Sequence, residues 1–288
     1  MKSGFRRSAL YVPGDSEKML QQSSNVAADV LLLNLEDGVA SAQKDAARDK
    51  VAQALKTVNF EGRETVVRIN GLNSNLGRTD LARIIPCGPN GICLPKVETA
   101  AEIVAAENDV LELERRSGLP EGRILFHAMI ESAAGVLHSY EISSASPRMA
   151  SLIFGSADYA KDVRCQPGQD RCELLLALQM IVTSARAAGI DAIDAPCFDI
   201  RNPVLLQNES MHARRLGYDG KSALHPGQLG TINRIFDVTP EEIEWAERVI
   251  AELDEAEIRG KALTTVDGKL LDNPHRAAAE RILRRKRT

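Results

Sequence analysis

The chain has 288 residues, 44% of them hydrophobic, a length that suits one domain of about 250 residues plus a short addition. A net charge of −4 favours neither nucleic acid nor a membrane surface as a partner. The five cysteines form no C-x-x-C pair, and no apolar run is long enough for a signal segment or a bilayer-spanning helix. We therefore expect free thiols and a cytoplasmic protein.

Short β-like runs alternate with helical segments along most of the chain. The expected strands cover 8–12, 30–35, 65–69, 91–94, 124–130, 151–154, 192–195 and 220–224. Most of these runs are continuously apolar, as strands buried on both faces should be. Eight repeats favour a TIM (β/α)₈ barrel over an open, doubly wound sheet. No G-x-G-x-x-G follows a strand, which argues against dinucleotide binding.

Helix signals fall between these runs. Helical spacing of apolar residues predicts helices over 42–55, 99–116, 173–188 and 208–216. Thr99 and Glu102 have the spacing of a capping box, which would open the second of these helices. Gly189 and Gly217 follow the last two helices, where a left-handed glycine is typical of a helix end.

The character of the chain changes after about residue 235. A charged helix over 239–258 is followed by alternating residues around Asp267 and Gly268, a pair that favours a hairpin turn, and then by a basic helix over 275–286. We predict a catalytic barrel over 1–235 and a small C-terminal extension of helices and a hairpin over 236–288.

Charged residues follow several of the expected strands. Glu36 and Asp37 come after the second strand, Arg68 after the third, Glu131 after the fifth and Asp158 after the sixth. In a barrel these strand ends meet at one rim, where barrel enzymes place their active sites. A rim that carries both acids and a guanidinium suits a divalent metal ion and an anionic substrate.

Glu131 and Asp158 follow consecutive strands and would be neighbours on the rim, where two carboxylates suit Mg²⁺. Both could instead cap helices, and for Asp158 that alternative is equally good. Arg68 offers the bidentate fork that binds a carboxylate, or it could merely neutralise nearby acids. Glu36 and Asp37 could act as general bases or hold a metal's ligands, or form a turn with Gly38.

Other chemistries find weaker support in the sequence. Lys96 follows a strand and could form a Schiff base, as in a metal-free aldolase, but charge balance is the favoured role. The five histidines lack zinc-site spacing, and His225 either lines the barrel mouth or is an ordinary loop residue. No serine-hydrolase elbow or phosphate-binding glycine loop is present.

Seven motifs in order resemble the citrate lyase β-subunit-like family, which includes malyl-CoA and citramalyl-CoA lyases within the HpcH/HpaI aldolase group. The motifs are RSALYVPG at 7–14, LED at 35–37, RIN at 68–70, LPKVE at 94–98, IE at 130–131, FGSAD at 154–158 and HPGQ at 225–228. Each motif alone is weak, but their order along nearly the whole chain is specific.

The resemblance implies a lyase that uses Mg²⁺, with Mn²⁺ as a substitute, to cleave a 3-hydroxyacyl-CoA into acetyl-CoA and a 2-oxo acid such as pyruvate or glyoxylate. Coenzyme A thus enters as part of the substrate. By motif match, Glu131 and Asp158 become the metal ligands, Glu131 also facing the substrate, while Arg68, with Glu36 nearby, binds the oxo-acid end.

The segment VDGKLLD at 266–272 is similar to the family's lid, whose final aspartate closes over a neighbouring subunit's site. Asp272 is thus the candidate acid/base, with Asp37 as the alternative, and the resemblance implies a homo-oligomer, a trimer or hexamer. Two departures stand out: Asn34 replaces the usual aspartate before Leu-Glu-Asp, and Gly38 replaces an alanine. Either change could alter specificity or metal affinity.

Three alternatives stay open at the level of sequence. The same scaffold could hydrolyse a malyl-CoA-type thioester, with water attacking the thioester carbonyl. It could be a citrate lyase β subunit that acts on a citryl thioester carried by an acyl carrier protein, although a lid argues against a bulky carrier. A non-catalytic, ligand-sensing protein is disfavoured because every expected site residue is present.

Overall fold

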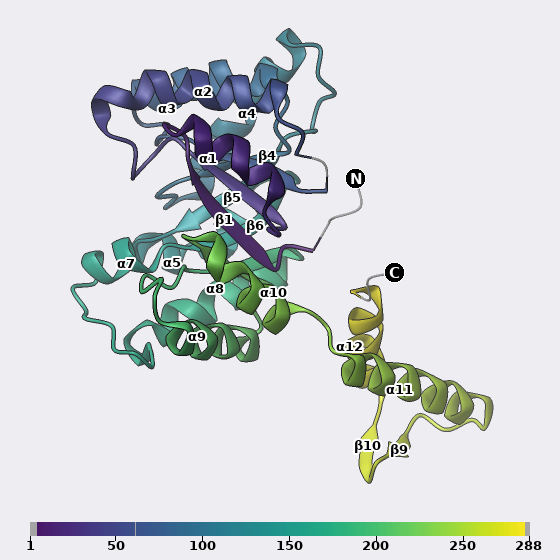
Figure 1. Cartoon of the computed structure of the whole chain (residues 1–288). Helices are drawn as coiled ribbons and strands as arrows, with labels where there is room; N and C mark the ends of the chain where they lie inside the picture. The colour runs from purple at the N-terminus through teal and green to yellow at the C-terminus, as the bar shows by residue number, and fades with distance from the viewer. Residues whose placement is uncertain (1–4, 61, 286–288) are drawn as a thin grey trace. The chain divides into compact units, whose positions relative to one another are not determined.

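The computed structural model describes residues 5–60 and 62–285 and separates into two compact units between Phe236 and Asp237. The strands of the first unit form one closed, parallel barrel in which each strand pairs with the next and β8 returns to β1 (Figure 1). They are β1 Ser8–Pro13, β2 Val30–Asn34, β3 Glu64–Arg68, β4 Gly91–Leu94, β5 Leu125–Ile130, β6 Met149–Phe154, β7 Asp191–Asp194 and β8 Gly220–Ala223. The predicted TIM barrel is confirmed.

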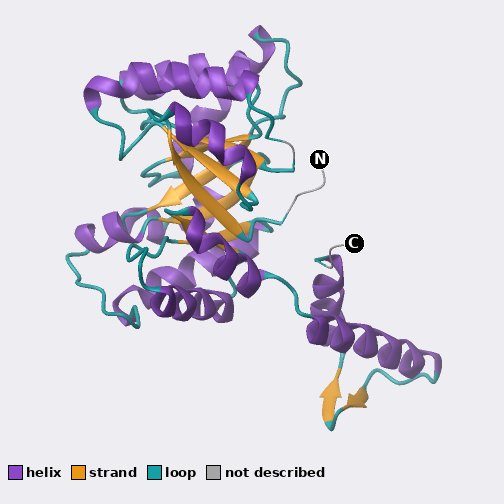
Figure 2. Ribbon diagram, in the orientation of Figure 1, coloured by secondary structure: helices purple, strands orange, loops and turns teal. Residues whose placement is uncertain are grey.

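Helices surround the barrel strands, which Figure 2 shows in orange at the centre of this unit. The α-helices are α1 Glu17–Gln22, α2 Lys44–Thr57, α3 Asn75–Ile84, α4 Ala100–Arg116, α5 Ala133–Leu137, α6 Ser139–Ser143, α7 Ser156–Asp162, α8 Leu175–Ala188, α9 Pro203–Leu216 and α10 Leu229–Phe236. Short 3-10 helices are η1 Ser23–Asn25, η2 Ser41–Gln43, η3 Ile85–Cys87, η4 Cys172–Leu174 and η5 Pro226–Gln228.

The expected helix ends are confirmed at three positions. Glu102 accepts a 2.8 Å hydrogen bond from the Thr99 backbone N–H, which completes the capping box of α4. Gly189 and Gly217 end α8 and α9 with φ of 72° and 102°. Helix α9 begins at Pro203 rather than at 208, because the Asn202 side chain caps it and proline suits the first helical turn.

Two hydrophobic layers stabilise the barrel. Alternate residues of the strands point to the barrel axis and to the helices, as Leu32 and Leu33 do on β2. The inner layer consists of Ala9, Val30, Leu32, Val66, Cys93, Met129, Ile153 and Ile193. Tyr11 packs on this layer from above. The barrel is therefore a filled core, and side chains at the strand ends can converge only on its rim.

The second unit has its own secondary structure and a small core. It contains α11 Pro240–Ile258, β9 Thr264–Val266, β10 Lys269–Leu271 and α12 Asn273–Arg284. Asp267 and Gly268 both have positive φ, as a tight hairpin turn between β9 and β10 requires. Buried Val249, Leu253 and Leu271 pack within it. Residue 286, where the last helix was expected to end, lies outside the described residues.

In the part of the chain that the structure describes, no helix combines the length and the apolar character needed to cross a bilayer.

Candidate active site

A cavity of about 630 Å³ lies at the carboxyl ends of the barrel strands. Four of the charged residues expected at the rim line it: Asp37, Arg68, Glu131 and Asp158. Loops after β1, β2, β6, β7 and β8 supply most of the remaining wall. The structure therefore brings the separate strand-end residues to one site, as barrel closure predicts.

Glu131 is the buried acid of this cavity. It follows β5, its residue is 3% exposed, and its Oε1 accepts a 2.8 Å hydrogen bond from the backbone N–H of Lys96. Burial raises the pKa of Glu131 to about 7, and the nearby Asp158 carboxylate adds to this effect while Arg68 opposes it. A carboxylate held this way gains from any cation that enters the cavity.

Asp158 lies in the first turn of α7 and is half-buried. The N-cap position of α7 belongs to Gly155, and that of α5, the helix after Glu131, belongs to Ser132. Neither acid therefore occupies a cap position, so the alternative interpretation of both as helix caps is not supported. Both carboxylates instead line the same cavity.

Gly155 makes room for Glu131. A Cβ built on Gly155 would lie 2.5 Å from both Cβ and Oε2 of Glu131, closer than real Cβ contacts come. A larger residue at 155 would push the Glu131 side chain aside, since its Cβ cannot swing away as a flexible end could. The glycine between β6 and α7 thus fixes where this carboxylate lies.

Arg68 places a buried guanidinium beside these acids. Its residue is 6% exposed, its Nη2 lies 2.6 Å from Oε2 of Glu36, and its Cζ lies 5.8 Å from the centre of the Tyr11 ring. Its Nε has no hydrogen-bond partner among the described residues. A buried donor without a partner is costly, so this atom is suited to an anionic ligand.

Lys96 connects the two sides of the site. Its Nζ lies 2.8 Å from Oε1 of Glu36 and 3.1 Å from Oδ2 of Asp37, while its backbone, at φ 51°, directs the N–H to Glu131. These ion pairs raise the pKa of Lys96 despite its partial burial, so the ammonium stays protonated. A Schiff base needs a neutral amine, so the geometry argues against the metal-free aldolase role.

Glu36 is held by protein groups at both oxygens, since Oε2 pairs with Arg68 and also accepts the backbone N–H of Asp37. This geometry favours a role in holding Arg68 over direct contact with a substrate. Asp37 is exposed at the mouth, and although its partial burial opposes the change, the hydrogen bond from Lys96 lowers its pKa. It is therefore ionised at neutral pH.

The unusual Asn34 shapes the loop that carries these acids. Its side-chain N–H donates to the backbone carbonyl of Asp37, and its Oδ1 accepts a 3.2 Å hydrogen bond from the Glu36 backbone. An ionised aspartate could not donate the first of these bonds. Gly38 follows with φ 96°, which favours glycine over alanine. The two departures therefore support one loop conformation.

Asp272 belongs to the C-terminal unit, where it occupies the N-cap position of α12. Its Oδ1 lies 2.7 Å from Nδ1 of His275, and about 44% of its side chain is exposed. His225, at the end of the barrel, lines the cavity, and its Nδ1 accepts a 3.0 Å hydrogen bond from the Gly227 N–H. The loop and mouth interpretations of His225 are thus compatible.

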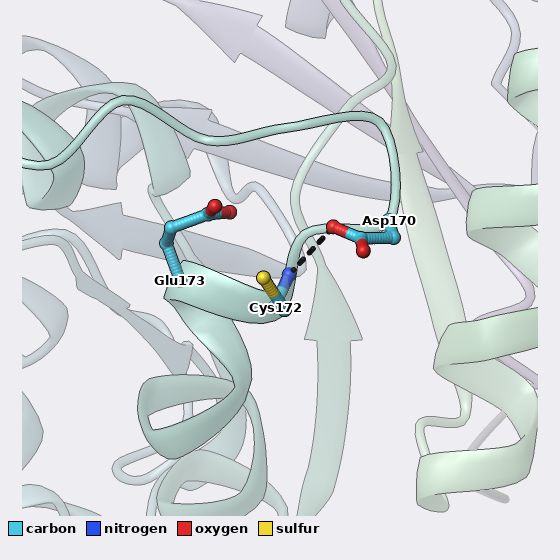
Figure 3. A group of neighbouring side chains, drawn as sticks. All are labelled: Asp170, Cys172 and Glu173. Carbon is cyan, nitrogen blue, oxygen red and sulfur yellow. Dashed lines mark hydrogen bonds between the residues drawn. The ribbon is translucent and has the colours of Figure 1, made fainter.

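A second group of potential metal ligands lies outside this cavity. Within residues 5–60 and 62–285, Asp170, Cys172 and Glu173 form one group of three whose ligand atoms lie within 4.8 Å of one another (Figure 3). Asp170 accepts a hydrogen bond from the Cys172 backbone, and Glu173 from that of Gly168. A hydrogen bond with Glu173 raises the pKa of the Cys172 thiol, which makes it a poor ligand.

The residues present at the rim fit a hard divalent cation. Glu131 and Asp158 offer carboxylate oxygens beside space for waters and substrate, as Mg²⁺ prefers, and a bound cation would offset the burial that raises the pKa of Glu131. Tyr11 and Gly155 were not singled out from the sequence. The sequence signal for each was its place within a motif, RSALYVPG for Tyr11 and FGSAD for Gly155.

Comparisons with known proteins identify the family of the chain. The profile of the HpcH/HpaI aldolase/citrate lyase family matches residues 7–226. The chain is 36% identical to the citrate lyase subunit beta of Leuconostoc mesenteroides subsp. cremoris over 280 residues, covering 97% of this chain and 93% of the relative. It is 35% identical to a (3S)-malyl-CoA thioesterase of Cereibacter sphaeroides, covering 96% of this chain and 93% of that protein.

A solved structure is similar to this chain in both fold and sequence. Protein CitE from Mycobacterium tuberculosis, in complex with magnesium, acetoacetate and coenzyme A, superposes with a TM-score of 0.78 at 28% identity. The match covers 98% of this chain and 98% of that chain.

Proposed function

We propose that this chain, which belongs to the HpcH/HpaI aldolase/citrate lyase family, is a magnesium-dependent lyase that cleaves a 3-hydroxyacyl-CoA into acetyl-CoA and a 2-oxo acid. The observation that carries the proposal is one cavity in which Glu131 and Asp158 lie beside the unsatisfied Nε of Arg68. The magnesium, acetoacetate and coenzyme A bound to the M. tuberculosis relative support it.

Some residues of the site would bind the metal ion and the substrate, and others hold those residues in position. Glu131 and Asp158 would hold the Mg²⁺, and Arg68 would bind the carboxylate of the oxo-acid end through its free Nε–H. When bound, the ion accepts substrate oxygens and lowers the pKa of the substrate hydroxyl. Lys96 and Glu36 keep Arg68 and Glu131 in place through the contacts described above.

Cleavage then requires a base. The base takes the proton of the substrate hydroxyl, the oxygen forms a carbonyl as the adjacent C–C bond breaks, and the bond's electrons become the enolate of the thioester. Return of that proton from the base to the enolate carbon gives acetyl-CoA and restores the base. The lowered pKa of Asp37 makes it a weak base, so we favour Asp272 of a neighbouring subunit in a trimer or hexamer.

The proposal is tested by product identification. Purified protein is incubated with malyl-CoA and with citramalyl-CoA in Mg²⁺, and the products are identified by mass spectrometry. Acetyl-CoA with glyoxylate or pyruvate supports the lyase, while free CoA with malate identifies the thioesterase that the Cereibacter relative suggests. Conversion only of a carrier-bound citryl thioester would assign the role of the Leuconostoc relative.

The base is tested in the same assay. Asp272→Asn should lower kcat by roughly 100-fold or more, the usual scale for loss of general acid or base catalysis, with Mg²⁺ affinity unchanged. Asp37→Asn is the matched comparison. An unchanged kcat in Asp272→Asn together with a large fall in Asp37→Asn would move the base to Asp37.

A further inference from the structure

We infer that Tyr11 is a second substrate-binding residue, whose hydroxyl donates a hydrogen bond to the same oxo-acid group that Arg68 binds. The inference deepens the proposed function and rests on it for the identity of the ligand. It rests on the position of the Tyr11 ring, on the partners of its hydroxyl and on the charges around it.

The barrel places the Tyr11 side chain at the floor of the cavity. Tyr11 lies on β1 in register with Leu32 of β2, and its ring packs on the inner layer of the barrel. It also lines the cavity together with Arg68, Met129 and Glu131. Its hydroxyl lies near the sulfur of Met129, which lines the same cavity.

The ring and the hydroxyl of Tyr11 have different partners. The Arg68 guanidinium lies over the ring, with 5.8 Å from Cζ to the ring centre, which is within range of a cation–π contact. The hydroxyl's hydrogen-bond partner among the described residues is the Met129 sulfur at 3.8 Å. A thioether is a weak acceptor, so the hydroxyl still has a strong hydrogen bond to donate.

The charges around the hydroxyl suit a donor. Burial raises the pKa of Tyr11 above its ordinary value of 10, the Glu131 and Glu36 carboxylates add to this effect, and Arg68 opposes it. The hydroxyl is therefore protonated at neutral pH and cannot serve as a base. Tyr11 and Arg68 line the same cavity, and the Nε of Arg68 lacks a hydrogen-bond partner among the described residues, so we place the anionic oxygen where both donors can reach it. The oxo acid would then accept two hydrogen bonds, one from the Nε–H of Arg68 and one from the hydroxyl of Tyr11.

The test is Tyr11→Phe, which keeps the ring under Arg68 and removes only the hydroxyl. Condensation of acetyl-CoA with pyruvate or glyoxylate gives KM for each reactant, and calorimetry with Mg²⁺ present gives Kd for the oxo acid without turnover. We expect KM and Kd for the oxo acid to rise roughly tenfold or more, the loss typical of a hydrogen bond to a charged group. KM for acetyl-CoA and the affinity for Mg²⁺ should stay within about twofold.

A matched variant separates the hydroxyl from general effects. Tyr140→Phe removes the hydroxyl of an exposed tyrosine that does not line the cavity. It should retain the wild-type affinity for the oxo acid. Equal losses in Tyr140→Phe and Tyr11→Phe would overturn the inference.

Two further outcomes are decisive. Unchanged Kd and KM for the oxo acid in Tyr11→Phe would overturn the inference, and so would a fall confined to kcat or to acetyl-CoA, which would place the hydroxyl at the thioester. Failure of the proposed function looks different: wild-type protein would convert no CoA thioester. The calorimetric comparison with pyruvate and glyoxylate would still decide the role of Tyr11.

Discussion

Two buried carboxylates at the same end of the barrel have pKa values shifted in opposite directions. Asp194, the last residue of β7, is fully buried and lies 2.6 Å from Arg171 and 2.7 Å from Lys221, which lower its pKa to about 2 although burial opposes them. Glu131, which follows β5, is also buried, at 3% exposure. Its carboxylate accepts one backbone hydrogen bond, from Lys96, and burial raises its pKa to about 7.

The difference separates a carboxylate that stabilises the fold from one that is suited to bind a ligand. Asp194 is neutralised within the protein, and Lys221 also pairs with Glu209 at 2.9 Å, so that cluster joins β7, β8 and α9. Glu131 faces a cavity and lacks a full countercharge. Burial alone therefore does not indicate a functional acid, whereas burial without a partner beside a cavity does.

The largest expected effect concerns the structural acid. Asp194→Ala leaves the Arg171 and Lys221 charges buried without their partner, which should lower the free energy of unfolding by about 3–5 kcal/mol. Urea unfolding measures the loss. Asp158→Ala, at a half-buried rim position, is the control and should change stability by less than about 1 kcal/mol. Similar losses in both variants would remove the distinction between the two acids.

Glu131→Gln should change metal binding and leave stability intact. Removal of a metal ligand should weaken Mg²⁺ binding by on the order of 100-fold or more, since loss of even an outer contact costs 10–100-fold. Stability without metal should be unchanged or higher, because the variant buries no charge. Calorimetry measures the affinity, with Glu173→Gln in the exposed acidic group as the control. Wild-type affinity in Glu131→Gln would exclude it as a ligand.

Gly155→Ala tests the packing that positions Glu131. The new methyl group would collide with the Glu131 side chain, so Mg²⁺ affinity should fall roughly tenfold, as it does when support for a ligand is lost. Gly230→Ala is the control, since a Cβ there meets nothing within 4 Å. Equal Mg²⁺ affinity in Gly155→Ala and Gly230→Ala would contradict the proposed packing role.

The pH dependence of the two acids should have opposite sign. Glu131 binds a proton on folding between its ordinary pKa of 4.5 and about 7, so its contribution to the stability of metal-free protein is present below that window and lost as pH rises through it. The contribution of Asp194 is present above pH 3.8 and lost as pH falls towards 2.

Magnesium affinity follows from the same titration. Because the ligand must lose its proton, affinity should fall about tenfold per pH unit below 7 in wild type and stay flat in Glu131→Gln. Calorimetry between about pH 5.5 and 8 measures both slopes. Parallel slopes in the two proteins would show that another group controls the metal's pH dependence.

The fold was predictable because its signals are local. Buried parallel strands are continuous apolar runs, so each expected strand agrees with the structure to within about two residues, and barrel closure alone brings Arg68, Glu131 and Asp158 to one rim. The early start of α9 at Pro203 shows the limit, since Asn202 and Pro203 carried the signal inside a segment taken as loop.

Residues whose roles depend on distant neighbours were not predictable. Tyr11 sits within an apolar run, and only the barrel brings Arg68 over its ring. Gly155 acquires its role from the Glu131 side chain across β5 and β6. Asp194 carried no signal because Arg171 and Lys221 reach it from another loop and another strand.

The central claim is that Glu131 and Asp158 share one divalent cation. A crystal grown or soaked with Mn²⁺ and examined by anomalous diffraction locates the ion directly. The account predicts one strong peak in the barrel cavity, bonded to both carboxylates and within reach of an oxo acid on Arg68. A peak at Asp170 and Glu173 with none between Glu131 and Asp158 would contradict it.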